Sequence, residues 1–250
     1  MSVVIINADD FGLNEHCSKA IAEAFSKELV TDTTMMATGD YFEEAVVLAK
    51  KEGFFDRIGI HFNLTEGEPL TEDIRKCGNF VRNGRFHKEY NRLKPLSSFE
   101  KQAVYRELSA QAQKIEDAGL TIAHADSHHH VHTAVFIAPI VARVCKEHGV
   151  DKIRLHRNLG QISSVKKVVK KRYNHWLKQQ GFITTDWFAY VMDIEDAPIP
   201  DNTEIMVHPD YDKEGVLIDR RGKEDGVPVG EALKDFVRER QVILGGYTKL

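Results

Sequence analysis

Short apolar runs alternate with amphipathic stretches along most of the chain. Short apolar runs indicate buried strands, and apolar residues recurring every three or four positions indicate helices. The pattern predicts strands at residues 3–6, 33–36, 57–62, 121–125, 152–155 and 203–207. It predicts helices at residues 41–51, 99–117, 135–148, 163–179 and 231–238, and another that begins near Asn14 and reaches Phe25. Repeated strand–helix units imply a parallel sheet, either open or closed into a barrel.

Two segments interrupt this alternation. Residues 67–98 form a long loop with a predicted hairpin at Asn83-Gly84, where Phe80 and Phe86 flank the turn. Residues 193–202 are rich in acids and proline. Loops longer than about 15 residues in a compact domain are usually functional or disordered. The aromatic residues favour a lid or substrate wall at 67–98, and the alternative is a surface flap that does not touch a ligand.

The bulk composition is that of one soluble globular domain. A length of 250 residues suffices for one large core, and neither a low-complexity linker nor an internal repeat divides the chain, so we expect residues 1–250 to form a single domain. The net charge of −4 gives no reason to expect a nucleic-acid or anionic-membrane partner. The basic run at 166–172 has helical spacing and is interpreted as a solvated helix face.

The cysteines and the N-terminal residues bear on the compartment. Cys17, Cys77 and Cys145 lie far apart without CxxC spacing, which suggests neither a disulfide framework nor a thiolate zinc site. The chain passes directly into the apolar residues 3–6 without a basic leader or cleavage signal, and no apolar run reaches membrane-spanning length. These features predict a protein of the reducing cytoplasm.

Five of the 12 histidines fall between His124 and His132. Packing alone explains this density poorly, because each buried imidazole brings polar nitrogens that need partners. Neutral imidazole is also the commonest metal ligand in proteins. A solvent-exposed histidine run and a purification tag are the alternatives, although a tag would lie at a terminus. The run therefore predicts a metal site nearby.

Further aspartates and histidines stand where predicted strands end. They are Asp9-Asp10 after the first strand, His61 near the end of the 57–62 strand, Asp126 to His128 after the 121–125 strand, and His208 after the 203–207 strand. In parallel α/β folds, the loops at the carboxyl ends of the strands meet on one face and bind ligands there. Four independent strand ends of this kind predict one shared site.

Each of these residues also has a structural interpretation. Aspartates such as Asp9-Asp10 often cap the following helix. His61 lies among apolar residues, where a core histidine with satisfied hydrogen bonds is the alternative. His208 is followed by Pro209 and is compatible with an ordinary turn histidine. The coincidence of the four positions, more than any one of them, favours the site.

The residue types favour metal-assisted hydrolysis. One aspartate with two histidines makes an open metal site that suits zinc, manganese, iron or cobalt, while imidazole suits magnesium less well. A bound metal lowers the pKa of water and polarises a carbonyl, a neighbouring carboxylate takes the proton, and a histidine protonates the leaving group. The sequence contains no G-x-S-x-G, Walker A or G-x-G-x-x-G motif, so serine nucleophiles and nucleotide phosphates find no support.

Three long motifs resemble those of the YdjC-like carbohydrate deacetylases, which include the chitooligosaccharide deacetylases. They are Asn7-Ala8-Asp9-Asp10-Phe11-Gly12, Gly59-Ile60-His61-Phe62-Asn63-Leu64-Thr65 and His124-Ala125-Asp126-Ser127-His128-His129-His130-Val131-His132, and Val207-His208-Pro209 resembles the family's late histidine motif. The resemblance covers most of the chain. It implies an α/β fold, a single-domain distorted (β/α) barrel related to the polysaccharide deacetylases.

The resemblance also assigns roles. It implies one divalent cation, magnesium or zinc with manganese and cobalt as further possibilities, held by Asp10, His61 and His128. Asp9 matches the catalytic base, and His208 matches the histidine that protonates the leaving amine. The implied reaction removes acetyl from an N-acetylated mono- or oligosaccharide. Some family members form dimers, which makes a homodimer an expectation by analogy.

Three other residues have supporting roles in this interpretation, namely Asp126, Arg154 and His130. Asp126 is expected to orient a metal ligand, Arg154 to orient Asp9 or the substrate, and His130 to contact substrate or support the ligands. The family usually has proline between two arginines where this chain reads Arg154-Leu155-His156-Arg157-Asn158, so His156 takes the place of proline. For Arg157 a surface ion pair is the alternative.

Two other functions remain open on sequence grounds. One is a metal-dependent amidase or esterase with a different acyl substrate, because the site defines the bond chemistry better than the substrate. The other is a metal-binding or sugar-binding protein without turnover. Asp9 distinguishes them, because a simple metal binder has no use for a second carboxylate beside Asp10.

Overall fold

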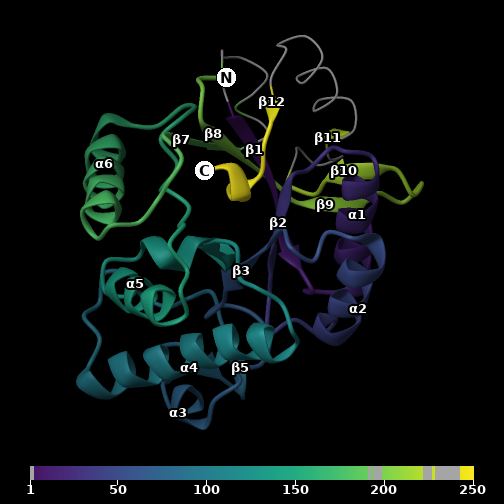
Figure 1. The fold of residues 1–250 in the computed structure, drawn as a ribbon. Coiled ribbons are helices and arrows are strands. Elements are labelled where there is room, and N and C mark those ends of the chain that lie inside the picture. The colour runs from purple at the N-terminus through teal and green to yellow at the C-terminus, as the bar shows by residue number, and fades with distance from the viewer. Residues whose placement is uncertain (1–2, 191–192, 194–198, 222–226, 229–242) are drawn as a thin grey trace.

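A curled parallel sheet organises the computed structural model, which describes residues 3–190, 193, 199–221, 227–228 and 243–250 (Figure 1). The strand order is β6 (Ala125–Ser127), β3 (Ile58–Phe62), β2 (Asp32–Met35), β1 (Val3–Phe11), β8 (Thr203–Val207) and β7 (Trp187–Tyr190), and β12 (Ile243–Leu244) also pairs with β1. Every pair in this sheet is parallel. The predicted α/β class and parallel sheet are therefore confirmed.

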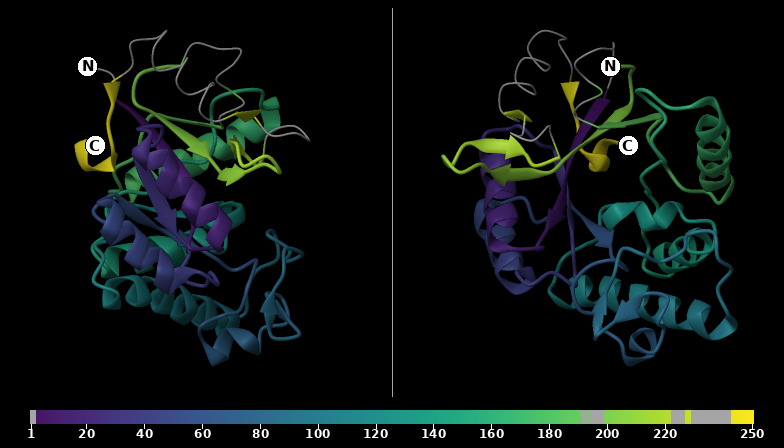
Figure 2. Two further views of the ribbon diagram at one scale, coloured as in Figure 1. Left: turned by 90° about the vertical axis from the view of Figure 1, so that its right-hand side faces the viewer. Right: turned by 180° about the vertical axis from the view of Figure 1, so that it is seen from behind.

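Helices surround the sheet (Figure 2). They are α1 (Glu15–Ser26), α2 (Phe42–Glu52), α3 (Glu72–Arg75), α4 (Ser98–Asp117), α5 (Ala138–Glu147) and α6 (Ser164–Gln179), with short 3-10 helices η1 (His128–Thr133) and η3 (Tyr247–Lys249). The predicted helices at 41–51, 99–117 and 163–179 agree with the structure within a residue or two, while 135–148 shortens to α5. Residues 231–238, also predicted as a helix, lie outside the described residues.

An irregular segment lies beside β6, at the edge of a parallel sheet that curls into a half-barrel. The amide of Arg154 donates to the carbonyl of Ala125 at 2.9 Å, and the amide of Ile153 donates to Ile183 at 3.2 Å. The predicted strand at 152–155 is wrong, because the segment forms only isolated bridges. Beyond these bridges, the amide of His156 donates to the side chain of Asn174 at 2.8 Å rather than to a strand.

Other strand predictions need correction. The strand expected at 121–125 lies at β6, and β7 was not predicted. A small antiparallel sheet after β8, with order β11-β10-β9, was also missed: β9 (Pro209–Tyr211), β10 (Leu217–Asp219) and β11 (Val227–Pro228). These strands have two to four residues. Segments so short give too little periodicity to identify from the sequence.

The long segment at 67–98 is ordered. It contains α3 and the predicted hairpin, formed by β4 (Val81–Arg82) and β5 (Arg85–Phe86). Asn83 and Gly84 have φ angles of 51° and 76°, as a two-residue turn with both central residues left-handed requires. The flanking Phe80 and Phe86 are buried, and the amide of Thr71 donates to Glu107 of α4 at 2.8 Å. These contacts attach the segment to the core.

Within the described residues, no helix combines the length and the apolar character needed to cross a membrane. Cys17, Cys77 and Cys145 are buried and free.

Buried Asp32 on β2 should make stability depend on pH. Burial raises the pKa of Asp32 to about 6, although the backbone N–H of Tyr247 donates to its carboxylate. A raised pKa means that this group's contribution to stability is present below its unfolded value of 3.8 and is lost as the pH rises through 6. We expect Asp32→Asn to gain about 1 kcal/mol on the wild type between pH 5 and pH 8. Urea unfolding of both proteins at pH 5 and pH 8 measures this gain. An equal change in the free energy of unfolding of the two proteins between these pH values would contradict it.

Candidate metal centre and catalytic site

A β-bulge at the end of β1 separates the side chains of Asp9 and Asp10. Opposite β2, Ala8 pairs with Thr33 and Phe11 with Met35, so β1 contains one extra residue. Asp10 has a φ of 72°, a left-handed conformation that is uncommon outside glycine. The bulge directs the two carboxylates to different partners. The capping alternative is wrong, because Asn14 caps α1 by accepting from the amide of Cys17.

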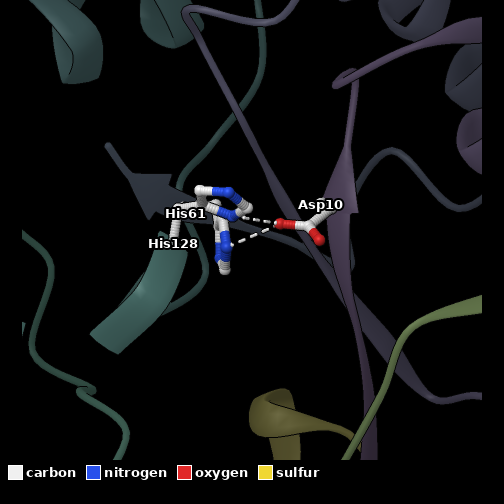
Figure 3. Close-up of side chains that lie close together, drawn as sticks. All are labelled: Asp10, His61 and His128. Carbon is white, nitrogen blue, oxygen red and sulfur yellow. Dashed lines mark hydrogen bonds and ion pairs between the residues drawn. The ribbon is translucent and has the colours of Figure 1, made fainter. Parts of the chain in front are cut away.

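Asp10, His61 and His128 form a buried triad (Figure 3). Oδ1 of Asp10 lies 3.0 Å from Nε2 of His61 and 2.7 Å from Nδ1 of His128. One atom of each side chain lies within 4.8 Å of the other two, which is compatible with shared coordination of one cation. The structure therefore brings together the three residues predicted as metal ligands, and they could hold a metal ion.

The hydrogen bonding of the two histidines supports a cation at this position. Nδ1 of His61 lies 2.6 Å from Asp126, and Nε2 of His128 lies 3.0 Å from Glu66. A neutral imidazole has one N–H, so an imidazole between two carboxylates needs an added proton or a cation on its second nitrogen. Although burial lowers the pKa of His61, Asp126 and Asp10 raise it to about 10. The donor set fits a divalent cation, which would supply the missing positive charge.

Asp9 is held by Arg154. The guanidinium donates from both terminal nitrogens to the two oxygens of Asp9 at 2.7 Å, and Asn7 donates to Oδ1 at 2.9 Å. Burial alone would raise the pKa of Asp9, but Arg154 holds it well below its usual range. Arg154 also contacts Asp126 at 2.5 Å and Glu204 at 2.7 Å, and is itself fully buried. Asp9 is thus a fixed, ionised carboxylate next to the triad.

His208 lies at the same end of the sheet. Its Nε2 is 3.9 Å from Oδ2 of Asp9, and its backbone N–H donates to Asp219 at 2.9 Å. Burial is the main cause that lowers the pKa of His208 to about 3; Asp9 and Asp10 act against it, and Arg221 and Arg220 add smaller lowering effects. The imidazole is therefore neutral near pH 7. The structure places His208 beside the carboxylate with which it is predicted to act.

The other histidines of the run have different positions. His130 stacks on Tyr190 and lies 3.0 Å from its hydroxyl, and His129 contacts Thr65 at 2.9 Å. His129 and His130 both have φ near 50°. Together with Asp10, they make three non-glycine residues at the site with a left-handed backbone conformation. Such conformations cost energy and cluster at functional sites. Of the five histidines in the run, His128 alone pairs with Asp10 among the described residues, and the ring of His129 lies against that of His128 with centroids 4.0 Å apart.

Several groups around the site were not predicted from the sequence. Glu66 contacts His128, Glu204 contacts Arg154, and Arg220 donates to Oδ2 of Asp10. Glu204 carried a usable signal, because a charged residue inside an apolar strand is rarely buried without a partner. Glu66 follows the polar end of β3. Arg220 follows a short antiparallel strand and had no comparable signal.

His156 stands where the family pattern has proline, between Arg154 and Arg157, and both arginines still have carboxylate partners. Arg157 forms an ion pair with Asp193 at 2.6 Å, and its guanidinium lies 4.4 Å from the centroid of Tyr190. Arg157 thus forms an ion pair, as the alternative expected, but a largely buried one instead of a surface pair. His156 lies beside α6, where its carbonyl accepts from Asn174 at 3.0 Å.

Comparisons with known proteins agree with these motifs. The family model described as YdjC-like protein matches residues 3–243. A carbohydrate deacetylase of Brevibacillus brevis is 31% identical over 255 residues, covering 99% of each chain. Carbohydrate deacetylase 1 of Listeria innocua is 30% identical over 245 residues, covering 96% of each.

A solved structure shows the same fold. It is that of an Enterococcus faecalis V583 protein provisionally named a cellobiose-phosphate cleavage protein, with a TM-score of 0.74 and 23% identity. The alignment covers 99% of this chain and 98% of that one. With the family model matching almost the whole sequence and relatives aligned end to end, the chain belongs to the YdjC-like protein family.

Proposed function

We propose that this protein is a carbohydrate deacetylase that hydrolyses the amide of an N-acetylated mono- or oligosaccharide to acetate and a free amine. The adjacent carboxylates of Asp9 and Asp10 carry this proposal. Asp10 faces two histidines in a cation site, whereas Asp9 is clamped by Arg154 beside His208. A protein that only bound a cation would have no use for the second carboxylate. The relatives named carbohydrate deacetylases give the substrate class.

Asp9 would accept a proton from the attacking water at Oδ2. Its Oδ1 already accepts from Arg154 and Asn7, whereas Oδ2 accepts only from Arg154 among the described residues. The clamp fixes the carboxylate but also makes it a weak base, because Brønsted behaviour ties basicity to pKa. A divalent cation held by Asp10, His61 and His128 would lower the pKa of water and polarise the amide carbonyl. Asp126 and Glu66 orient the two imidazoles for that cation.

His208 would carry a proton to the leaving nitrogen. Because its pKa is lowered to about 3, an imidazolium formed there is a strong acid that gives up its proton readily to an amine. Its Nε2 faces Oδ2 of Asp9, so the two groups that exchange protons with the reactants lie on one side of the site. Overall, water adds its hydroxyl to the acyl carbon, and the proton that Asp9 takes from the water passes through His208 to the leaving nitrogen, so that both side chains return to their starting charge.

An acetate-release screen tests the proposal. The protein is treated with a chelator and assayed on N-acetylglucosamine and acetylated chitooligosaccharides after addition of magnesium, zinc, manganese or cobalt. We expect metal-dependent acetate release from at least one sugar, with no release after chelation alone. Matched O-acetylated sugars and simple acetamides form the control arm. Turnover confined to that arm, or none in either arm, would overturn the assignment.

A further inference from the structure

The C-terminal turn of the chain reaches the buried network behind Asp9. β12 pairs with β1 in parallel, and η3 follows it directly (Figure 1). This places Tyr247 in the core with 1% of its surface exposed. Its hydroxyl donates to Glu204 at 2.6 Å, and its ring stacks on His124 with centroids 3.8 Å apart. Tyr247, three positions before Leu250, thus contacts two groups of the network.

One route from Tyr247 to Asp9 runs through Glu204 and Arg154. One oxygen of Glu204 accepts from Tyr247, and the other accepts from Nε of Arg154 at 2.7 Å. The guanidinium is a planar, rigid fork, so the anchor at Nε sets the direction of both terminal N–H groups that clamp Asp9. Without the Tyr247 hydroxyl, one oxygen of this buried carboxylate has no donor among the described residues. A buried acceptor without a donor is costly, which favours a shift of Glu204 and with it Arg154.

A second route runs through His124 and Asn7. The Asn7 amide donates to Oδ1 of Asp9 at 2.9 Å, so its carbonyl oxygen faces Nε2 of His124 at 2.9 Å. His124 must therefore hold its proton on Nε2 to donate to that oxygen. The aromatic stack with Tyr247, with an interplanar angle of 11°, fixes the plane of His124 and hence this bond. Both routes end on the same carboxylate.

We propose that Tyr247 is a positioning residue for Asp9, so that the C-terminal turn is part of the catalytic machinery. This inference rests on the proposed function for its kinetic consequence. The hydroxyl holds the Arg154 clamp through Glu204, and the ring holds the Asn7 contact through His124. Neither group touches the triad of Asp10, His61 and His128. Arg154 reaches that triad only through Asp126, which contacts His61, so a change at Tyr247 acts on the Asp9 clamp before it acts on the cation site.

The variant Tyr247→Phe tests the first route while keeping the stack. We expect kcat for acetate release to fall about tenfold, with KM and the dissociation constant for the divalent cation changed less than about twofold. Combining it with Glu204→Gln should cost no more than the larger single change, because both act through the same bond. The control is Tyr105→Phe, which removes a tyrosine–carboxylate bond to Glu147 at the surface and should leave kcat unchanged.

A second measurement does not depend on turnover. In ¹⁵N NMR spectra the Nε–H signal of buried Arg154 should shift and exchange faster with solvent in Tyr247→Phe, but not in Tyr105→Phe. An unshifted signal, an unchanged kcat, or an equal loss of cation affinity and kcat would overturn the inference. If the wild type releases no acetate, the proposed function fails and the NMR signal alone decides the positioning role. If Tyr247→Phe does not fold, Glu204→Gln provides the same readouts.

Discussion

Asp9→Asn is expected to reduce acetate release by about a thousandfold or more, because it removes the group that accepts the proton of water. The amide cannot take up a proton at neutral pH, and its nitrogen would meet a donor of Arg154 where the wild type has an acceptor. The fold should survive, since Arg154 keeps Asp126 and Glu204 as buried counter-charges. The rate is measured as acetate released under saturating metal.

Cation affinity separates this result from a loss of the metal. Asp9 does not belong to the Asp10, His61 and His128 triad. We therefore expect the dissociation constant for the divalent cation, measured by calorimetry, to change less than about tenfold in Asp9→Asn. Asp186→Asn is the matched control, a surface aspartate paired with Lys178, and should keep full activity. Undiminished acetate release by Asp9→Asn would refute its role as base.

Asp10→Asn should instead weaken cation binding severely and abolish activity. The carboxylate supplies the negative charge that faces both imidazoles, and an amide gives the cation a weaker, neutral ligand. Mutating a residue that only orients a metal ligand can lower metal affinity by roughly 100-fold. Asp10 would contact the cation itself, so we expect its loss to lower the affinity by at least that factor. Asparagine tolerates left-handed backbone better than most residues, so the φ of 72° at this position is preserved.

The two variants together form a sharp contrast. Calorimetric titration with zinc or manganese after chelation should show strong binding to Asp9→Asn and weak binding to Asp10→Asn, while both lack activity. Equal affinities in the two variants would show that the cation does not bind at the Asp10, His61 and His128 triad. Normal activity in Asp10→Asn would exclude this triad from the reaction.

Much of the fold was readable from the pattern of apolar residues. Three long helices, α2, α4 and α6, lie close to their predicted bounds, because helices of ten or more residues repeat their period several times. The strand β3 also lies close to its predicted bounds. The hairpin at Asn83-Gly84 was also readable, since its turn requires residues that accept positive φ. The short strands β7, β9, β10 and β11 were not, although the four-residue strand β2 was predicted at 33–36.

The sequence predicted most residues of the candidate site but not the hydrogen bonds and ion pairs between them. Parallel strands end at one edge of a sheet, so residues such as Asp10, His61 and His128 had to come near one another once the strand ends were recognised. Their spacing could not reveal the bulge that turns Asp9 toward Arg154 and Asp10 toward the histidines. A bulge depends on the register between two strands, which is a long-range property.

By itself, the sequence determined the α/β class, the parallel sheet and the set of strand ends that carry chemistry, because these follow from local periodicity and residue type. Only the tertiary structure decided which carboxylate is clamped, that Glu66 and Arg220 join the site, and that Tyr247 contacts Glu204. These contacts join residues 43 to 210 positions apart in the sequence. A contact of that kind is fixed by packing of the whole sheet, and no short stretch of sequence encodes it.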